Sequence, residues 1–134
     1  MKAAFGAGCF WGVQQVFDEL PVKTIVGYMG GETKNPSYEQ VSSGKTGHTE
    51  VVLVEYDPEE VSYKELLEVF FKIHDPTIMK KDQYKSVIFY YNEEQREQAE
   101  KLINNKMMTE LRKAPEFYEA EDYHQKYYKN HPIS

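Results

Sequence analysis

The sequence contains one cysteine, Cys9, and one tryptophan, Trp11. A single cysteine excludes a disulfide within the chain, which agrees with a reducing compartment. It also excludes a thiolate cluster for zinc, and none of the four histidines pairs with another at the spacing of metal ligands. We therefore expect neither a disulfide nor a metal site.

Long apolar runs and a basic charge balance are also absent. No run of about 18 apolar residues is available to span a membrane, and the N-terminus lacks the pattern of a signal peptide. Lys and Arg number 16 against 22 Asp and Glu, which gives a net charge of −6. This acidic balance argues against nucleic acid or an anionic membrane as the main partner. We expect a cytoplasmic protein.

Repeats, low-complexity tracts and linkers are missing as well. A length of 134 residues and a hydrophobic content of 40% suit one domain over residues 1–134, and we expect a monomer. Strand, helix and strand alternate around a long loop at residues 32–47. This order predicts an α+β domain with a mixed central sheet and helices packed against it.

Apolar periodicity and turn residues place the expected elements. Strands are predicted at residues 1–5, 22–28, 51–56 and 87–91. The third of these is almost entirely apolar, which favours a central position in the sheet. Helices are predicted at residues 10–20, 62–73, 92–107 and 121–129, the second and third capped by Ser62 and Asn92.

Residues 6–12, with the sequence GAGCFWG, lie where the first strand becomes the first helix. The first backbone N–H groups of a helix are unpaired and carry partial positive charge. A thiol at that point is predicted to shift toward the nucleophilic thiolate. Phe10 and Trp11 beside it can form the walls of an apolar pocket for a small substrate.

Two other interpretations of this segment compete. A lone cysteine is often an inert buried side chain, although such a cysteine needs no glycine-lined turn. A dinucleotide-binding turn requires a third glycine at position 11, where the chain has Trp11. The dinucleotide interpretation is therefore excluded.

The segment Gly8-Cys9-Phe10-Trp11-Gly12 resembles the signature of the peptide methionine-sulfoxide reductase A family. Further blocks resemble that family in the same order over nearly the whole chain, namely residues 35–38, 43–50, 74–76, 83–86 and 120–125. The resemblance implies an enzyme that reduces methionine S-sulfoxide, free or in proteins, to methionine. It also implies an α/β roll related to the split βαβ sandwich.

The same resemblance implies roles for individual residues. Cys9 is the nucleophile, and Glu50, in the Gly-His-x-Glu block, is the acid that protonates the departing oxygen. Tyr38 and Tyr84 match the tyrosines that hydrogen-bond the sulfoxide oxygen. Phe10 and Trp11 match the pocket for the methionine methyl group, and His48 falls in the block that contains the acid, so we count it among the substrate-binding candidates.

One part of the chain departs from the family pattern. The family usually has a longer loop with a functional aspartate before the Gln-Tyr block, whereas this chain is shorter there. Asp82 is the only carboxylate in that loop, and its spacing to Tyr84 differs from the pattern. Three possibilities are kept: Asp82 has the role of the family aspartate, Asp75 has it, or no residue of this chain has it. Gln14 stands where many members have Glu.

Turnover requires a second thiol, because the first step leaves Cys9 as a sulfenic acid. Many members carry a resolving cysteine near the C-terminus, whereas this sequence has none. The expectation is a one-cysteine enzyme without a bound cofactor, recycled by an external thiol such as thioredoxin.

Two alternatives from other classes are kept. In a thiol hydrolase, Cys9 would pair with His124 or His74 as base, and Asp75 or Asp122 would orient that histidine. In a peptide-binding module, the aromatic-rich loop would hold the ligand, but the Gly8-Cys9 turn would have no role.

Overall fold

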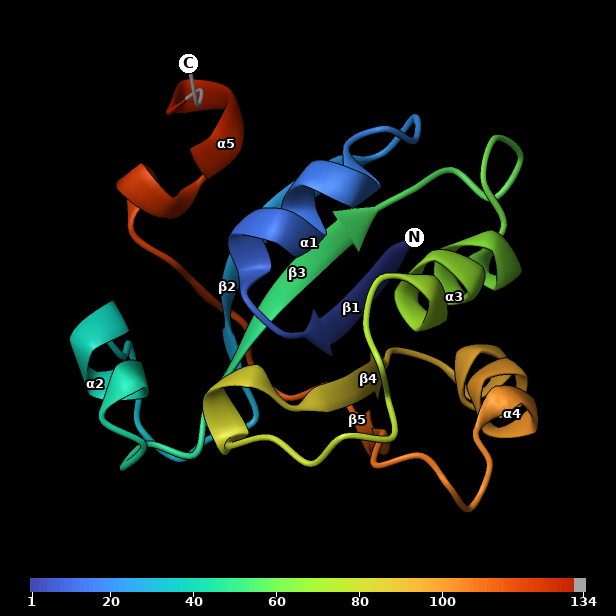
Figure 1. The fold of residues 1–134 in the computed structure, drawn as a ribbon. Helices are drawn as coiled ribbons and strands as arrows, with labels where there is room; N and C mark the ends of the chain where they lie inside the picture. The colour runs from blue at the N-terminus through green and yellow to red at the C-terminus, as the bar shows by residue number, and fades with distance from the viewer. Residues whose placement is uncertain (132–134) are drawn as a thin grey trace.

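A mixed sheet forms the centre of the computed structural model, which describes residues 1–131 (Figure 1). Within these residues the sheet has six strands in the order β5-β4-β1-β3-β2-β6. Among these six described strands only β4 and β5 pair in parallel, and every other neighbouring pair is antiparallel. The strands are β1 (Lys2–Ala7), β2 (Lys23–Met29), β3 (Thr49–Glu55), β4 (Ser86–Tyr90), β5 (Glu110–Lys113) and β6 (Tyr118–Glu119). The predicted α+β class with a mixed sheet is confirmed.

The first half of the chain forms a split βαβ unit. Strands β1 and β2 both run antiparallel to β3, which lies between them, so they are parallel to each other. Helix α1 (Phe10–Phe17) connects them. The insertion of β3 between two parallel strands is the arrangement that the resemblance implied, and it confirms the central position predicted for the apolar third strand.

Helices cover one face of this sheet and an irregular segment covers the other. Phe5 on β1 packs against Phe17 of α1 and Phe70 of α3 (Tyr63–Lys72), with both ring-centroid distances at 5.4 Å. On the opposite face, apolar side chains of β1–β4 pack against Ala114 and Phe117. Because side chains alternate along a strand, β1 and β3 are buried on both faces, which accounts for their continuous apolar sequences.

The predicted caps are confirmed, while several helix limits differ from the prediction. Ser62 caps α3, and Asn92 caps α4 (Glu93–Leu102), each by accepting a backbone N–H three residues later. Helix α1 ends at Phe17 rather than at residue 20, and α4 ends at Leu102 rather than at 107. The expected loop at 32–47 contains a short helix, α2 (Tyr38–Ser42), that begins with a capping box at Ser37.

The C-terminal part differs most from the prediction. The residues between the helices predicted at 92–107 and 121–129, where no element was predicted, form β5 and β6 at the two edges of the sheet. The predicted helix at 121–129 is two pieces, the 3₁₀ turn η2 (Asp122–His124) and helix α5 (Tyr127–Asn130). Lys126, with φ of 53°, breaks the chain direction between them. The single domain over residues 1–134 stays a prediction, and it includes three residues outside the described part.

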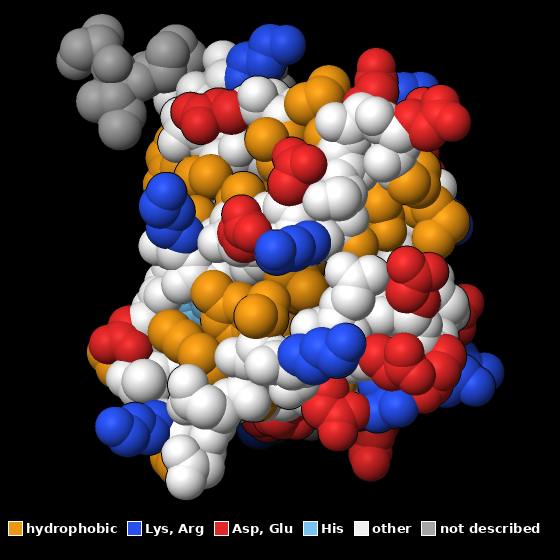
Figure 2. Space-filling model, turned by 90° about the vertical axis from the view of Figure 1, so that its right-hand side faces the viewer, with side chains coloured by type: hydrophobic (Ala, Val, Ile, Leu, Met, Phe, Trp, Pro, Cys, Tyr) orange, Lys and Arg blue, Asp and Glu red, His pale blue; other side chains and the backbone are white. Residues whose placement is uncertain are grey.

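Charged side chains of both signs lie intermixed on the face that carries α3 and α4, with apolar patches between them (Figure 2). None of the helices within residues 1–131 has the length and apolar character needed to cross a membrane.

Candidate active site

Cys9 lies in the turn between β1 and α1, as the sequence predicted. Gly8 has φ of +101°, a conformation open to glycine and strained for other residues. Cys9 is the N-cap of α1 and is exposed, and its side chain makes no capping hydrogen bond. The thiol opens onto a hollow of about 400 Å³ lined by Gly8, Cys9, Lys80, Lys81 and Tyr84.

The Cys9 thiol is not shifted toward thiolate in this site. Partial burial of the side chain raises its pKa above the usual value and outweighs the backbone N–H groups of Trp11 and Gly12, which lower it. The negative charge of Glu50 raises the pKa further. The direction of this shift is opposite to the one predicted, because loss of hydration exceeds the stabilisation from the helix N-terminus.

Glu50 is the second residue of β3 and is 1% exposed. Its Oε1 accepts the backbone N–H of Phe10 at 3.2 Å, and its Oε2 accepts the Gln83 side-chain amide at 2.7 Å. Burial raises the pKa of Glu50, while these two donors and the charge of Lys81 lower it. The net shift is upward, so the carboxyl group keeps its proton to a higher pH than an exposed glutamate.

Tyr84 and Tyr38 lie next to these two groups. Tyr84 is the last residue of the 3₁₀ turn η1 (Asp82–Tyr84), and Tyr38 is the first residue of α2. Burial raises the pKa of Tyr84, and Glu50, the Tyr38 hydroxyl and Cys9 raise it further. The Tyr84 hydroxyl therefore stays protonated and can donate a hydrogen bond at neutral pH.

Phe10 and Trp11 extend from the Cys9 turn into an aromatic cluster. Phe10 is 1% exposed and packs between Tyr28 and His124, at ring-centroid distances of 5.8 and 5.2 Å. Trp11 stacks on Tyr127 of α5 at 3.6 Å with an interplanar angle of 4°. The indole N–H donates to His124 Nδ1 at 2.9 Å. The C-terminal helix thus covers one face of Trp11.

The histidines considered for a hydrolase have other partners. His124 Nδ1 accepts from Trp11, so its buried Nε2 carries the proton of the neutral ring. His74 contacts the Phe70 carbonyl at 2.7 Å and the Ser86 hydroxyl at 2.8 Å. Burial lowers the pKa of both rings. Among the hydrogen bonds of residues 1–131, no histidine bonds to Cys9, so the arrangement that a Cys–His hydrolase needs is not formed there.

His48 and Asp82 lie in the framework around the hollow. His48 Nδ1 accepts the Gly31 N–H at 3.0 Å, and its Nε2 lies 2.6 Å from the Thr33 carbonyl oxygen. Both ring nitrogens are therefore occupied by the loop after β2. The Asp82 carboxylate is 58% exposed and lies 3.6 Å from Lys85 Nζ. Its backbone carbonyl, rather than its side chain, accepts the Thr49 hydroxyl at 2.6 Å. Asp75 is exposed and bonds to Thr77.

Two residues that sequence analysis did not select hold the site together. Glu121 accepts the Tyr28 hydroxyl at 2.9 Å and the Tyr38 backbone N–H at 3.0 Å, which joins β2, α2 and the C-terminal segment. Gln83 contacts Glu50 directly. Gln83 and Glu121 both lie in blocks that resemble the family, residues 83–86 and 120–125, so the position of each was a usable signal.

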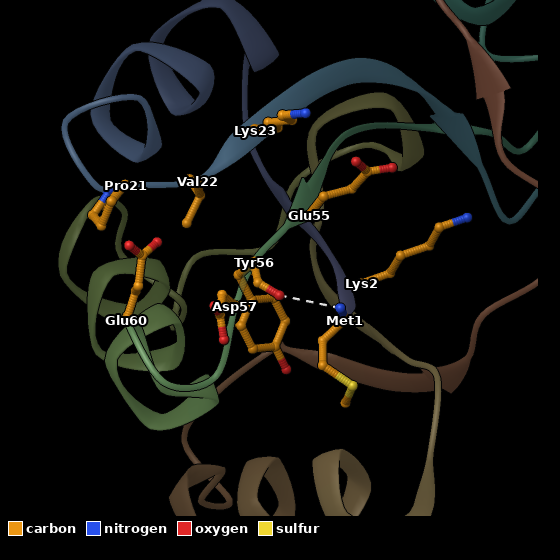
Figure 3. A pocket seen from close by; sticks show the side chains of 9 residues that line it. All are labelled: Met1, Lys2, Pro21, Val22, Lys23, Glu55, Tyr56, Asp57 and Glu60. Atoms are coloured by element: carbon orange, nitrogen blue, oxygen red, sulfur yellow. Dashed lines mark hydrogen bonds between the residues drawn. The ribbon is translucent and has the colours of Figure 1, made fainter.

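A second and larger hollow, of about 710 Å³, lies elsewhere on the surface (Figure 3). It is lined by Met1, Lys2, Pro21, Val22, Lys23, Glu55, Tyr56, Asp57 and Glu60. It lies where β1 begins, whereas Cys9 follows the other end of that strand. Six residues of strand separate the two hollows by about 20 Å. Its lining includes none of the candidate site residues.

The metal-binding side chains of residues 1–131 do not come together in a group of three or more His, Cys, Asp or Glu that could hold an ion.

The sequence and the fold both match one family of enzymes. The family model for peptide methionine sulfoxide reductase matches residues 1–134. The MsrA reductase of Acinetobacter baumannii (strain AYE) is 48% identical over 145 residues, covering 98% of this chain and 84% of its own length. That of Methanothermobacter thermautotrophicus is 47% identical over 148 residues, covering 98% and 88%.

Solved structures agree with this match. The reduced form of Mxr1 from Saccharomyces cerevisiae is similar with a TM-score of 0.92 and 30% identity, over 100% of this chain and 87% of Mxr1. Methionine sulfoxide reductase A of Corynebacterium diphtheriae is similar with a TM-score of 0.89 and 32% identity, over 99% and 76%. A structure of Mxr1 in complex with Trx2 has a TM-score of 0.68 and 25% identity, over 95% and 84%.

Proposed function

Since this chain belongs to the peptide methionine sulfoxide reductase family and reduces methionine sulfoxide, we propose that Cys9 is its nucleophile and Glu50 its acid. The observation that carries the proposal is the buried Glu50 carboxyl group, which Phe10 N–H holds beside the Cys9 turn at 3.2 Å. Its raised pKa means that the carboxyl group keeps a proton for transfer to a higher pH than an exposed glutamate would. A protonated Glu50 also removes the negative charge that opposes a Cys9 thiolate.

The first half-reaction transfers oxygen from substrate to enzyme. The Cys9 sulfur attacks the sulfoxide sulfur as a thiolate, and Glu50 protonates the sulfoxide oxygen as the S–O bond weakens. Overall, one thiol and one sulfoxide become one cysteine sulfenic acid and one thioether. The Cys9 sulfur loses two electrons, and the methionine sulfur gains two. The proton released by the thiol replaces the one that Glu50 gave.

The surrounding side chains bind the substrate in this proposal. The hydroxyl groups of Tyr38 and Tyr84 donate to the sulfoxide oxygen, and Phe10 and Trp11 contact the methyl group. The neutral state of Tyr84 supports its part. For His48 and Asp82 we propose indirect roles: His48 holds the loop after β2, and the Asp82 carbonyl holds Thr49, the residue before Glu50.

Recycling requires thiols from outside the chain, because the sequence has no second cysteine. An external thiol attacks the Cys9 sulfenic acid and releases water to form a mixed disulfide. A second thiol of the same reductant then releases Cys9 and becomes the disulfide itself. The complex of Mxr1 with Trx2 supports thioredoxin as the reductant class. Preference for the S epimer, action on free and protein-bound methionine sulfoxide, a monomeric state and a cytoplasmic location stay predictions.

The test is an assay on separate S and R epimers of a methionine-sulfoxide peptide with dithiothreitol, using wild type and Cys9→Ser. We expect the wild type to reduce the S epimer and Cys9→Ser to have no activity, with unchanged circular dichroism. Glu50→Gln should lose about 10²-fold or more in kcat, which is the usual contribution of an acid. Wild-type activity in either variant would contradict the assigned roles.

The one-cysteine route has its own measurement. Enzyme treated with substrate and no reductant should yield one equivalent of methionine product, and mass spectrometry should find Cys9 heavier by one oxygen. A cross-link to another residue of the same chain would contradict this route.

A further inference from the structure

The two carboxyl oxygens of Glu50 have different kinds of partner. Oε1 accepts a backbone N–H, whose direction is fixed, whereas Oε2 accepts the side-chain amide of Gln83 at 2.7 Å. Gln83 is 2% exposed, and the same amide nitrogen lies 3.2 Å from the hydroxyl of Ser42. Gln83 therefore links Glu50 to the last residue of α2, the helix that begins with Tyr38.

The other end of the Gln83 amide has no partner. Its carbonyl oxygen Oε1 is buried, and within residues 1–131 nothing donates a hydrogen bond to it. A buried acceptor left unpaired is costly, so this arrangement needs a reason. The reason lies in its neighbours, because the Ser42 hydroxyl and a protonated Glu50 can donate as well as accept.

The amide has two orientations, and each suits one charge state of Glu50. With the nitrogen toward Oε2, an amide N–H donates to the carboxylate. Rotation of the amide by about 180° places the carbonyl oxygen there instead, where it accepts the proton of the neutral acid. Ser42 can pair with the amide in both orientations. The second orientation supplies donors for the Gln83 carbonyl oxygen, while the amide N–H groups move to the position that has no hydrogen-bond partner within residues 1–131. The two orientations therefore differ in which end of the amide is paired, and the proton of Glu50 decides between them.

We propose that Gln83 is a positioning residue whose amide turns over with the proton of Glu50, holding the acid before transfer and stabilising the carboxylate afterwards. This inference rests on the proposed role of Glu50 as the acid. Gln83 lies in η1 together with Tyr84, so the same turn places the positioning amide and the tyrosine that faces Cys9. Acid and oxygen-binding tyrosines are thereby held in one connected unit.

The first measurement uses the unmodified protein. The titration of Glu50 is followed by the NMR signal of its carboxyl carbon, which gives the pH midpoint of the group. The side-chain NH₂ signals of Gln83 should change at the same pH midpoint, because the hydrogen-bond partner of the amide changes when Glu50 loses its proton. Gln95, a second buried glutamine, bonds to the Lys2 carbonyl and to Tyr56, away from Glu50. Its NH₂ signals should not change at that midpoint. Gln83 signals that ignore this midpoint would overturn the inference.

The second measurement uses Gln83→Leu, with Gln95→Leu as the matched control for loss of a buried amide. Leucine is chosen over methionine because an oxidised methionine is itself a substrate. We expect Gln83→Leu to raise the Glu50 midpoint, since the carboxylate loses a donor. It should lower kcat about 10-fold or more, with KM changed less than about twofold. Gln95→Leu should leave the midpoint and kcat near wild type.

Glu50→Gln separates the two proposals. If Glu50→Gln keeps wild-type kcat, the acid assignment fails. If Glu50→Gln loses activity while Gln83→Leu keeps the wild-type kcat and Glu50 midpoint, only the inference about Gln83 fails.

Discussion

At the scale of single residues, burying an acid such as Glu50 costs stability whenever its carboxyl group is ionised. Its pKa in the folded chain is raised above the unfolded value. The contribution of the neutral carboxyl group to the free energy of unfolding is therefore complete at pH values below the pKa of Glu50 in the unfolded chain. It is lost as pH rises through the raised folded pKa. Above that point the ionised, buried carboxyl group lowers the stability of the folded chain.

Glu50→Gln should therefore stabilise the protein at about pH 8 and not at about pH 4. The gain is about 1.4 kcal/mol for each unit by which folding raises the pKa. Urea unfolding at the two pH values measures it, with exposed Glu97→Gln as the control. If Glu50→Gln were no more stable than the wild type at about pH 8, the buried carboxylate would not destabilise the protein, and the prediction would be wrong.

At the scale of elements, the β1–α1 turn decides where the thiol points. Gly8 has φ of +101° there, whereas Gly12 lies inside α1. A Cβ built on Gly12 meets no atom within 4 Å. Of the two glycines that flank the Cys9-Phe10-Trp11 segment, Gly8 is therefore required by its backbone conformation. Gly12 is not required by conformation or by space, because a side chain fits there.

Alanine at the two positions should have opposite effects on stability. Gly8→Ala should destabilise by about 1 kcal/mol or more, because alanine is strained at that φ. It should also lower kcat/KM by displacing Cys9. Gly12→Ala should stabilise by up to about 1 kcal/mol, the difference in helix propensity. Urea unfolding compares them, and Gly8→Ala with wild-type stability would contradict the strain argument.

At the scale of the whole molecule, the C-terminal segment crosses back to the start of the chain. Trp11 bonds to His124, 113 residues later in the sequence. Burial keeps both His124 and His74 neutral by lowering their pKa values. A lowered histidine pKa contributes stability that is complete above the unfolded value and is lost as pH falls through the folded pKa.

The Tm of the protein should therefore fall as pH decreases below about 6.5, the pKa of histidine in an unfolded chain. His74→Gln and His124→Gln should each reduce this loss, whereas His131→Gln, at an exposed position, should not. Fluorescence of the only tryptophan should follow the same transition, because protonated His124 cannot accept the indole N–H. An unchanged pH slope in both variants would contradict this account.

Local features could be predicted from the sequence because their partners are neighbours. The strand-to-helix turn at Cys9, the caps Ser62 and Asn92, and the position of Glu50 at a strand start all depend on nearby residues. The family resemblance supplied the chemistry of these positions. Each of these features follows from backbone conformation and side-chain type over a few residues.

Other features were decided only by the tertiary structure. Strand β5 has the charged sequence ELRK and forms because the edge of β4 offers hydrogen bonds to it. The partners of Glu50 come from residues 10 and 83, and burial in the folded chain raises the pKa of Cys9 against the local helix effect. Burial depends on which distant segments meet, so the charge states of the site are a property of the folded chain.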